Sequence, residues 1–191
     1  NGADPNIPNN EGKTAYYLVS VEQRNWDLCN LLSEHYPIDL NAETSLKSTL
    51  LYDYIKMCYS PTLSKEELKF ITFFAENGAD PMAPNQSSYG QIETAADIII
   101  KKDFPLFEAF FGLFTLDAQA TDDHGNTLLH KVCAIDLNFD ANKAKDLYRK
   151  VKFLLEKGAD ASRTNNNDKT AVILASDDNL KEKTVALLLK Q

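Results

Sequence analysis

The sequence is poor in several features that mark particular classes of protein. Its 191 residues include only three cysteines, and their wide spacing is neither a disulfide framework nor a zinc-binding pattern. No apolar run reaches the length of a transmembrane helix. The net charge is -8 and no basic stripe is visible, so nucleic acid and anionic membranes are not expected partners.

Motifs for catalysis and cofactor binding are also absent from the sequence. It contains no phosphate-binding loop, no dinucleotide-binding glycine pattern, no zinc-protease motif and no serine-hydrolase motif. The composition is otherwise near the globular average, with 43% hydrophobic and 25% charged residues. The length suffices for one domain, or one short array of repeats, with a sizeable core.

What the sequence does contain is a short phrase that recurs. Gly-Ala-Asp occurs at 2–4, 78–80 and 158–160, and two degenerate copies align with it at 37–39 and 115–117. A threonine lies 12 residues after the first residue of four copies, and 16 residues after Gly78. A recurring interval of this kind indicates stacked structural repeats.

Each of these threonines precedes an apolar stretch with helical spacing, and a threonine hydroxyl suits the N-cap of a helix. A second amphipathic stretch then runs up to the next phrase, such as 151–155 before Gly158. Glycine there suits the residue after a helix, where positive φ is needed. The predicted unit is helix, turn, helix and extended loop. The threonines are Thr14, Thr49, Thr94, Thr127 and Thr170.

This organisation resembles the ankyrin repeat family, whose unit of about 33 residues opens its first helix with Thr-Pro-Leu-His. The closest match is Thr127-Leu128-Leu129-His130, which follows the loop pattern Asp122-Asp123-His124-Gly125-Asn126. The other four openings are degenerate, and the family's proline is missing from all five. The resemblance covers the whole chain. It implies an all-α solenoid of stacked helix-turn-helix units with inter-repeat hairpin loops.

We expect one ankyrin-repeat domain over 1–191. Residues 1–9 would be the tail of a preceding repeat, so we expect the chain to be a fragment of a longer protein. Compared with the family, the second and fourth repeats carry extra residues near 60 and 138, and the 84–91 loop is longer than its counterparts. The successive repeats are expected at about 10–43, 44–89, 90–121, 122–165 and 166–191.

Two groups of residues invite a chemical interpretation. His130 and Cys133 lie on neighbouring turns of one helix, where a nucleophile and its base would be. The resemblance instead implies that His130 is the family's structural histidine, and Cys133 is a core residue. Asp122, Asp123 and His124 could bind a metal, but a turn also requires polar residues. We therefore predict no catalytic residues, no cofactor and no metal.

The remaining cysteines and aromatic residues are assigned mainly to packing. Cys29, Cys58 and Cys133 fit buried free thiols in a reducing intracellular compartment. The phenylalanines over 104–114 form a helical stripe that is mostly core, with a partly exposed contact as the alternative. Trp26 is expected to pack just before a helix over 27–32, or else to make a rim contact. Ser64 and Pro105 are expected at the starts of second helices.

The resemblance also implies where a partner would bind, namely the hairpin tips and the first helices of a concave face. These positions mix acids, amides, lysines and a few apolar residues, as protein–protein surfaces do. The candidate partner-binding residues are Asn10, Glu11, Lys13, Val21, Glu22, Leu46, Lys56, Met57, Tyr89, Lys101, Lys102, Asp123, His124, Asn126, Ile135, Asn166, Asn167 and Lys169, with Ala134, Asp177 and Asp178 as further first-helix positions.

We therefore predict a monomeric protein–protein interaction scaffold without nucleic acid or membrane insertion. Degenerate repeats, irregular insertions and a composition poor in arginine resemble the ankyrin-containing effectors that intracellular bacteria secrete. The expected role is then the targeting part of an effector that binds a host protein, in the cytoplasm or after secretion into a host cell. The alternative is an accessory repeat domain that shapes an enzyme active site upstream of residue 1. A third reading is intramolecular packing only.

Overall fold

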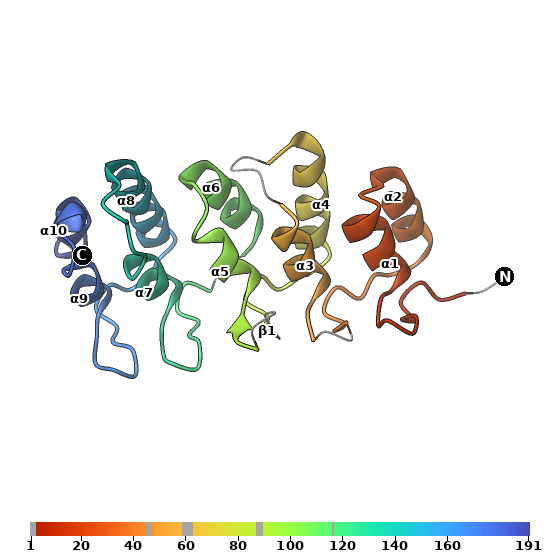
Figure 1. Ribbon diagram of the computed structural model, residues 1–191, viewed down its shortest axis with the longest axis horizontal. Coiled ribbons are helices and arrows are strands. Elements are labelled where there is room, and N and C mark those ends of the chain that lie inside the picture. Colours follow the sequence, from red (N-terminus) through yellow and green to blue (C-terminus); the bar gives the residue numbers. More distant parts are fainter. Residues whose placement is uncertain (1–2, 45–46, 59–62, 87–89, 116) are drawn as a thin grey trace. The chain divides into compact units, whose positions relative to one another are not determined.

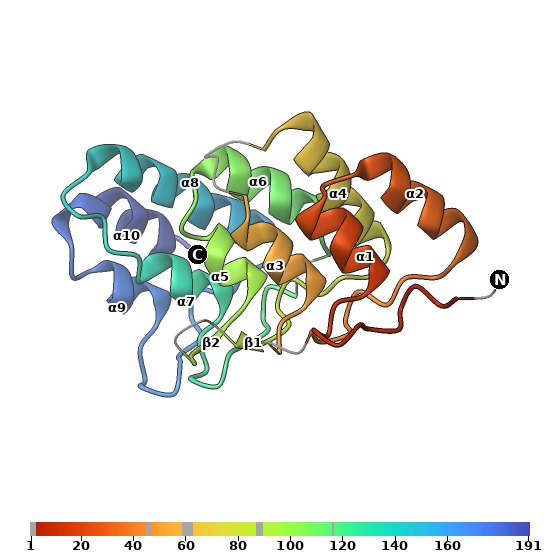
Figure 2. The same cartoon turned by 45° about the vertical axis from the view of Figure 1, so that its right-hand side comes forward.

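The computed structural model describes residues 3–44, 47–58, 63–86, 90–115 and 117–191. It divides into two compact units, unit 1 (residues 1–99) and unit 2 (residues 100–191), and each is described by itself. Within each unit the helices run in pairs (Figures 1 and 2). The first helices form one layer, the second helices form another, and the hairpin loops extend past the first helices.

Unit 1 contains two complete helix pairs and the first helix of a third. The third hairpin is a short antiparallel ladder that pairs Asn85 with Glu93 and Gln86 with Ile92. Within the described residues α2 packs against α4, and α3 packs against α5. The elements are α1 (Ala15–Tyr17), which continues as the π-helix η1 (Leu18–Glu22), α2 (Trp26–His35), α3 (Leu50–Lys56), α4 (Lys65–Glu76), β1 (Asn85–Gln86), β2 (Ile92–Glu93) and α5 (Ala95–Ile99).

Unit 2 begins with a second helix and adds two complete pairs. Helix α8 contacts α6, α7 and α10, so it lies at the centre of the unit's packing. Helix α9 packs against α7 and α10. The elements are α6 (Phe104–Leu113), α7 (Leu128–Cys133), α8 (Ala141–Glu156), α9 (Ala171–Ala175), the 3-10 helix η2 (Asn179–Lys181) and α10 (Glu182–Leu188).

The threonine prediction is confirmed in all five repeats. Each threonine hydroxyl accepts a hydrogen bond of 3.1 to 3.4 Å from the backbone N–H three residues later. Four of the five precede their helix in an extended conformation, as an N-cap does, and Thr94 directly precedes α5. Loss of such a cap typically costs about 1 kcal/mol.

The aspartate of the recurring phrase closes a turn in every copy. Its aspartate accepts a hydrogen bond of 2.8 to 3.1 Å from the N–H two residues later. Gly78 and Gly158 have φ of +82° and +90°, as predicted for the residue that follows a second helix. The phrase is therefore structural. Its aspartates are Asp4, Asp39, Asp80, Asp117 and Asp160.

A side-chain amide near the end of three phrases joins one repeat to the next. The amide of Asn6 donates to the carbonyl of Pro37 at 2.8 Å, and that of Gln119 donates to Gly158 at 2.9 Å. The amide of Asn41 lies 3.5 Å from the carbonyl of Gly78. Each acceptor is the first residue of the following phrase, so these bonds set the register between neighbouring repeats.

Aromatic side chains fill the cores of both units. In unit 1, Trp26 makes edge-to-face contacts with Phe70 and Phe73, with ring centroids 5.3 and 5.9 Å apart. The expected helix over 27–32 is longer than predicted and begins at Trp26, because the side chain of Asn25 caps it. In unit 2, the stripe over 104–114 is largely core: Phe107, Phe110 and Phe111 are fully buried.

The predicted starts of the second helices are also correct. Ser64 forms a capping box with Glu67 at the start of α4, and Pro105 lies in the first turn of α6. The extra residues of the fourth repeat lengthen α8 to 16 residues and form the turn before it. The insertion in the second repeat falls partly at 59–62, outside the described residues.

Candidate partner-binding surface

Three of the hairpin tips, the first, fourth and fifth, share one local design. In the first tip the side chain of Asn9 accepts bonds from the N–H groups of Glu11 and Lys13, at 2.9 and 3.0 Å. Asp122 and Asn165 occupy the same position in unit 2 and accept the corresponding pair of bonds. Counted from that side chain, the fourth residue of each tip has a positive φ. These residues are Gly12, Gly125 and Asp168.

Neighbouring tips are bonded to one another in unit 2. Asn166 donates its backbone N–H to the carbonyl of His124 at 2.9 Å and its amide to the carbonyl of Asp123 at 3.1 Å. The amide of Asn165 donates to the side chain of Asn126 at 2.7 Å. A Cβ on Gly125 would lie 2.4 Å from the Asn166 side chain, so the close approach of the tips requires glycine.

The tips present most of the predicted contact residues to solvent. Lys13 is half-buried between Glu11 and Glu22, with Nζ 2.9 and 2.6 Å from their carboxylates. The Glu22 and Glu11 carboxylates raise the pKa of Lys13. Asn126 is also half-buried. The exposed tip candidates are Asn10, Glu11, Asp123, His124, Asn166, Asn167 and Lys169.

Two candidate residues lie outside the described part of the chain. They are Leu46 and Tyr89, which were predicted to belong to the second and third tips. The remaining tip candidates stay predictions, because position alone does not demonstrate binding.

In the fourth tip, the group formed by Asp122, Asp123 and His124 stabilises the turn. The Asp122 carboxylate accepts bonds from the N–H groups of His124 and Asn126 and lies 3.3 Å from the ammonium of Lys131. Partial burial raises the pKa of Asp122, but the bonds from Asn126 and Lys131 outweigh it and hold the pKa below its ordinary value. Across the described ranges no three His, Cys, Asp or Glu side chains are grouped to hold a metal ion.

His130 and Cys133 do not form a nucleophile and base. Nδ1 of the His130 ring is hydrogen-bonded to the hydroxyl of Thr127. Nε2 lies 3.1 Å from the carbonyls of both Arg163 and Lys169, in the next hairpin. Cys133 is fully buried, and burial raises the pKa of its thiol to about 12. His130 therefore joins two neighbouring repeats and Cys133 is a core residue, as the resemblance implied. Cys29 and Cys58 are also free and buried.

The first-helix candidates are placed differently from the prediction at two points. Val21 is only 5% exposed, because the first helix continues as a π-helix. The prediction carried Val21 over from the family's first helices, and the i→i+5 bonds of a π-turn shift side chains away from the spacing of a regular α-helix. Lys101, Lys102 and Ile135 lie just beyond the first helices, in the links to the second helices. Glu22, Lys56 and Met57 are exposed.

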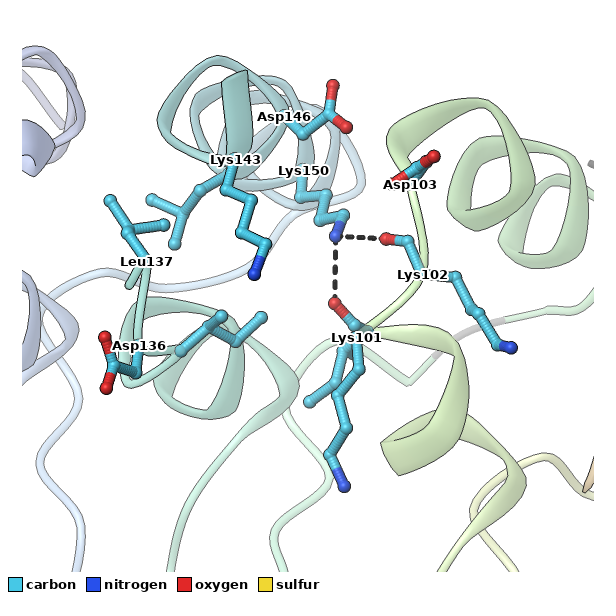
Figure 3. Close-up of a pocket in the computed structure, with 11 residues that line it drawn as sticks. Lys101, Lys102, Asp103, Asp136, Leu137, Lys143, Asp146 and Lys150 are labelled. Atoms are coloured by element: carbon cyan, nitrogen blue, oxygen red, sulfur yellow. Dashed lines mark hydrogen bonds between the residues drawn. The ribbon is translucent and has the colours of Figure 1, made fainter. Parts of the chain in front are cut away.

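These link residues line a pocket of about 340 Å³ within unit 2, shown in Figure 3. Its apolar lining comes from Ile100, Ile135, Leu137 and Leu147. Four lysines and three aspartates also line it. They are Lys101, Lys102, Lys143, Lys150, Asp103, Asp136 and Asp146.

Two lysines of unit 2 are almost fully buried. Lys150 is 5% exposed and donates to the carbonyls of Ile100, at 2.9 Å, and Lys102. Lys181 is 3% exposed and donates to the carbonyl of Cys133 at 3.0 Å, at the end of α7. Each lysine satisfies carbonyls that the local backbone leaves unpaired.

The structure also presents a surface residue that the sequence analysis missed. Phe139 is 98% exposed, the most exposed large hydrophobic side chain among the described residues. It lies in the insertion near 138, where Asn138 and Phe139 both have positive φ. The irregular spacing indicated the insertion, but no sequence signal showed that its phenylalanine faces solvent.

None of the described helices is both long enough and apolar enough to cross a membrane. No protein-family model matches the chain. No curated protein matches it either.

Many solved structures are similar to the chain, and three of them are described here. The ankyrin repeat domain of Bcl-3, described as a member of the IkappaB protein family, has a TM-score of 0.68 and 20% identity, covering 100% of this chain and 73% of that chain. The ankyrin repeat protein EF0377 has a TM-score of 0.66 and 16% identity, covering 99% and 85%.

The third is from the complex of the predatory endopeptidase Bd0816 of Bdellovibrio bacteriovorus with the immunity protein Bd3460. It has a TM-score of 0.63 and 18% identity, covering 100% of this chain and 87% of that chain. Identities this low establish fold alone, and the five-fold register of threonine caps and aspartate turns agrees with it. The chain therefore has the all-α ankyrin-repeat solenoid fold.

Proposed function

We propose that this chain is a protein-binding scaffold that contacts a partner through its hairpin tips and the links that follow its first helices. The fold supports this, because repeat arrays present extended surfaces on which side chains vary independently of the core. The exposed candidates also combine charged, amide and apolar groups, as interfaces do. The observation that carries the proposal is the exposure of Phe139.

The turn that carries Phe139 is held by hydrogen bonds. The Asp136 carboxylate accepts from the N–H of Asn138 at 2.8 Å, and the carbonyl of Leu137 accepts from Asp140 at 2.9 Å. Full burial of a phenylalanine side chain is worth about 1.5–3 kcal/mol, which this residue forgoes. An ordered turn that presents an aromatic side chain to water fits an interface anchor.

The surroundings of Phe139 suggest the chemistry of the contact. Phe139, Ala134 and Leu180 line a shallow hollow in unit 2 whose acidic members are Asp136, Asp177 and Asp178. Leu180 is 39% exposed. The hollow also contains Lys181, which lies 3.5 Å from Asp177, so Asp136 and Asp178 are its acids without that ion pair. Apolar side chains beside these carboxylates favour a partner segment that carries an apolar residue beside lysine or arginine.

The proposed setting is a host cell, in which the chain would be the targeting part of a bacterial effector. The support is compositional: the repeats are degenerate, the insertions irregular and the arginines only three, Arg24, Arg149 and Arg163. A eukaryotic lysate is therefore the first place to look for the partner.

Photo-crosslinking tests the proposal. The chain with p-benzoylphenylalanine in place of Phe139 should crosslink one protein from a eukaryotic lysate. Excess wild-type chain should suppress the product, and excess Phe139→Ser should not. The control places the same crosslinker at Lys152, an exposed position on α8. Equal crosslinking at both positions, or no specific product at 139, would refute Phe139 as the anchor.

A further inference from the structure

The pocket of Figure 3 has an unusual distribution of charge. The ammonium groups of Lys143 and Lys150 point into it, whereas the carboxylates of Asp103, Asp136 and Asp146 point away. The mouth is therefore positive, although the whole chain carries a net charge of -8. The local field favours an anionic group.

The Lys150 ammonium has hydrogen-bonding capacity left. A lysine ammonium has three N–H donors, and carbonyls of Ile100 and Lys102 take two. Within the described ranges no carboxylate lies at ion-pair distance from Lys150, even though the side chain is 5% exposed. The carboxylates that act on Lys150, those of Asp146 and Asp103, lie beyond ion-pair distance. Burial of the ammonium is therefore still costly, and a ligand carboxylate would be stabilised there.

Lys143 supplies the second positive group, from the first turn of α8. It is exposed, and no described carboxylate forms an ion pair with it. Behind the two ammonium groups the pocket wall is apolar, formed by Ile100, Ile135 and Leu147 together with Leu137. The site thus offers two cations beside an aliphatic surface.

We propose that this pocket binds the C-terminal residue of a partner protein when that residue is aliphatic. The terminal carboxylate would lie between Lys143 and Lys150, and the side chain would pack on Ile135 and Leu147. This inference rests on the proposed function, since it names the part of a partner that unit 2 receives.

A chain terminus fits better than an internal acidic residue for a geometric reason. In a C-terminal leucine, isoleucine or valine, the carboxylate and the aliphatic side chain share one Cα. A pocket of about 340 Å³ accommodates such a residue with its preceding peptide group. An internal aspartate or glutamate would need a second residue to fill the apolar part.

Peptide binding, measured without any partner protein, tests the pocket. The probe is Gly-Ser-Gly-Ser-Ala-Leu with a free C terminus, titrated into the full chain and followed by backbone amide NMR shifts. Saturable shifts are expected at Ile135, Lys143 and Leu147. Amidation of the terminus should weaken binding at least about tenfold, because it removes the negative charge.

A matched pair of variants locates the site. Lys143→Met keeps an alkyl side chain and should lower the affinity for the free-acid peptide about tenfold. Lys145→Met, at another exposed position on α8, should leave that affinity unchanged. Equal binding of the acid and amide peptides, or no shift at about 10 mM peptide, would overturn the proposal. So would tighter binding of Gly-Ser-Leu-Glu-Gly-Ser amide.

The two proposals fail separately. If the chain crosslinks a partner at position 139 but does not bind the free-acid peptide, the proposed function stands and the pocket proposal is refuted. A chain that binds the peptide and crosslinks nothing retains the pocket and loses the role of Phe139.

Discussion

Units 1 and 2 satisfy the carbonyls between their helices with different cations. In unit 1, Arg24 donates to the carbonyl of Met57 at 2.7 Å and lies 3.5 Å from the Glu67 carboxylate. In unit 2, Lys181 and Lys150 do this work from buried positions. Arginine has five donors in a fixed fork, so one side chain reaches a carbonyl and a carboxylate together.

The difference has a consequence for binding. Arg24 stays partly exposed and paired with Glu67, so its charge is compensated within unit 1. Lys181 lies 3.5 Å from Asp177, but Lys150 has no described carboxylate within ion-pair distance. The charge of Lys150, which forms no ion pair with a described carboxylate, faces a pocket, and this makes the pocket suited to an anion.

The largest effect should come from removing the best-buried cation. Lys181→Ala is expected to lower the free energy of unfolding by about 3 kcal/mol, because the Cys133 carbonyl loses its donor and the packed alkyl chain is lost. Chemical denaturation measures this. Lys181→Met keeps an alkyl side chain and should lower the free energy of unfolding by only about 1–2 kcal/mol. Equal stability of Lys181→Ala and wild type would show that this contact is dispensable.

Lys150 should give unit 2 a pH dependence that Arg24 cannot give unit 1. Burial lowers the pKa of Lys150 from its ordinary 10.5, against the opposing effect of Asp146 and Asp103. Between the lowered pKa and 10.5 the unfolded chain binds more protons, so stability rises with pH there. At lower pH the cost of the buried charge is fully present.

The measurement is the difference in unfolding free energy between wild type and Lys150→Met across alkaline pH, which cancels the other titrating groups. The stability of the wild type relative to the variant should increase as the pH approaches 10.5. A difference that stays constant with pH would mean that Lys150 titrates as an ordinary exposed lysine.

Loss of the arginine in unit 1 should matter less. Arg24→Ala is expected to cost about 1 kcal/mol, since its ion pair with Glu67 is partly exposed and such pairs contribute little. Denaturation at low and high salt separates the two contributions, because only the ion pair is screened. A loss as large as that of Lys181→Ala would remove the contrast between exposed and buried cations.

The smallest effect on stability is expected at Lys143. Lys143→Met should change the unfolding free energy by less than about 0.5 kcal/mol, because the side chain is exposed and has no described ion pair. Thermal unfolding checks this. A marked loss would make Lys143 structural, and its effect on peptide binding would then lose its meaning.

Much of the fold could be predicted from the sequence, because the signals act within a few residues. A threonine hydroxyl bonds an N–H three residues later, and a phrase aspartate bonds one two residues later. These contacts need no distant partner, so the pattern appears in the sequence directly. The five-repeat register and the ankyrin-repeat fold follow from them.

The candidate site was less predictable, and Val21, Phe139 and Lys150 show why. Val21 is buried in a π-turn, which the resemblance to the family's first helices did not imply. Lys150 was an ordinary helical lysine in sequence, but its bonds reach residues 48 and 50 positions away. Phe139 reads as a core residue by type and is 98% exposed.

The sequence by itself determined the presence of the repeats and the structural roles of the threonines, the phrase and His130. Only the tertiary structure decided which charged groups are buried, which carbonyls they reach and where an apolar side chain is left in water. The physical reason is the sequence separation of the contacts, because caps and turns are hydrogen bonds between residues two or three apart in the chain. Burial and charge pairing depend on whatever another helix brings into contact, which a repeat register alone does not specify.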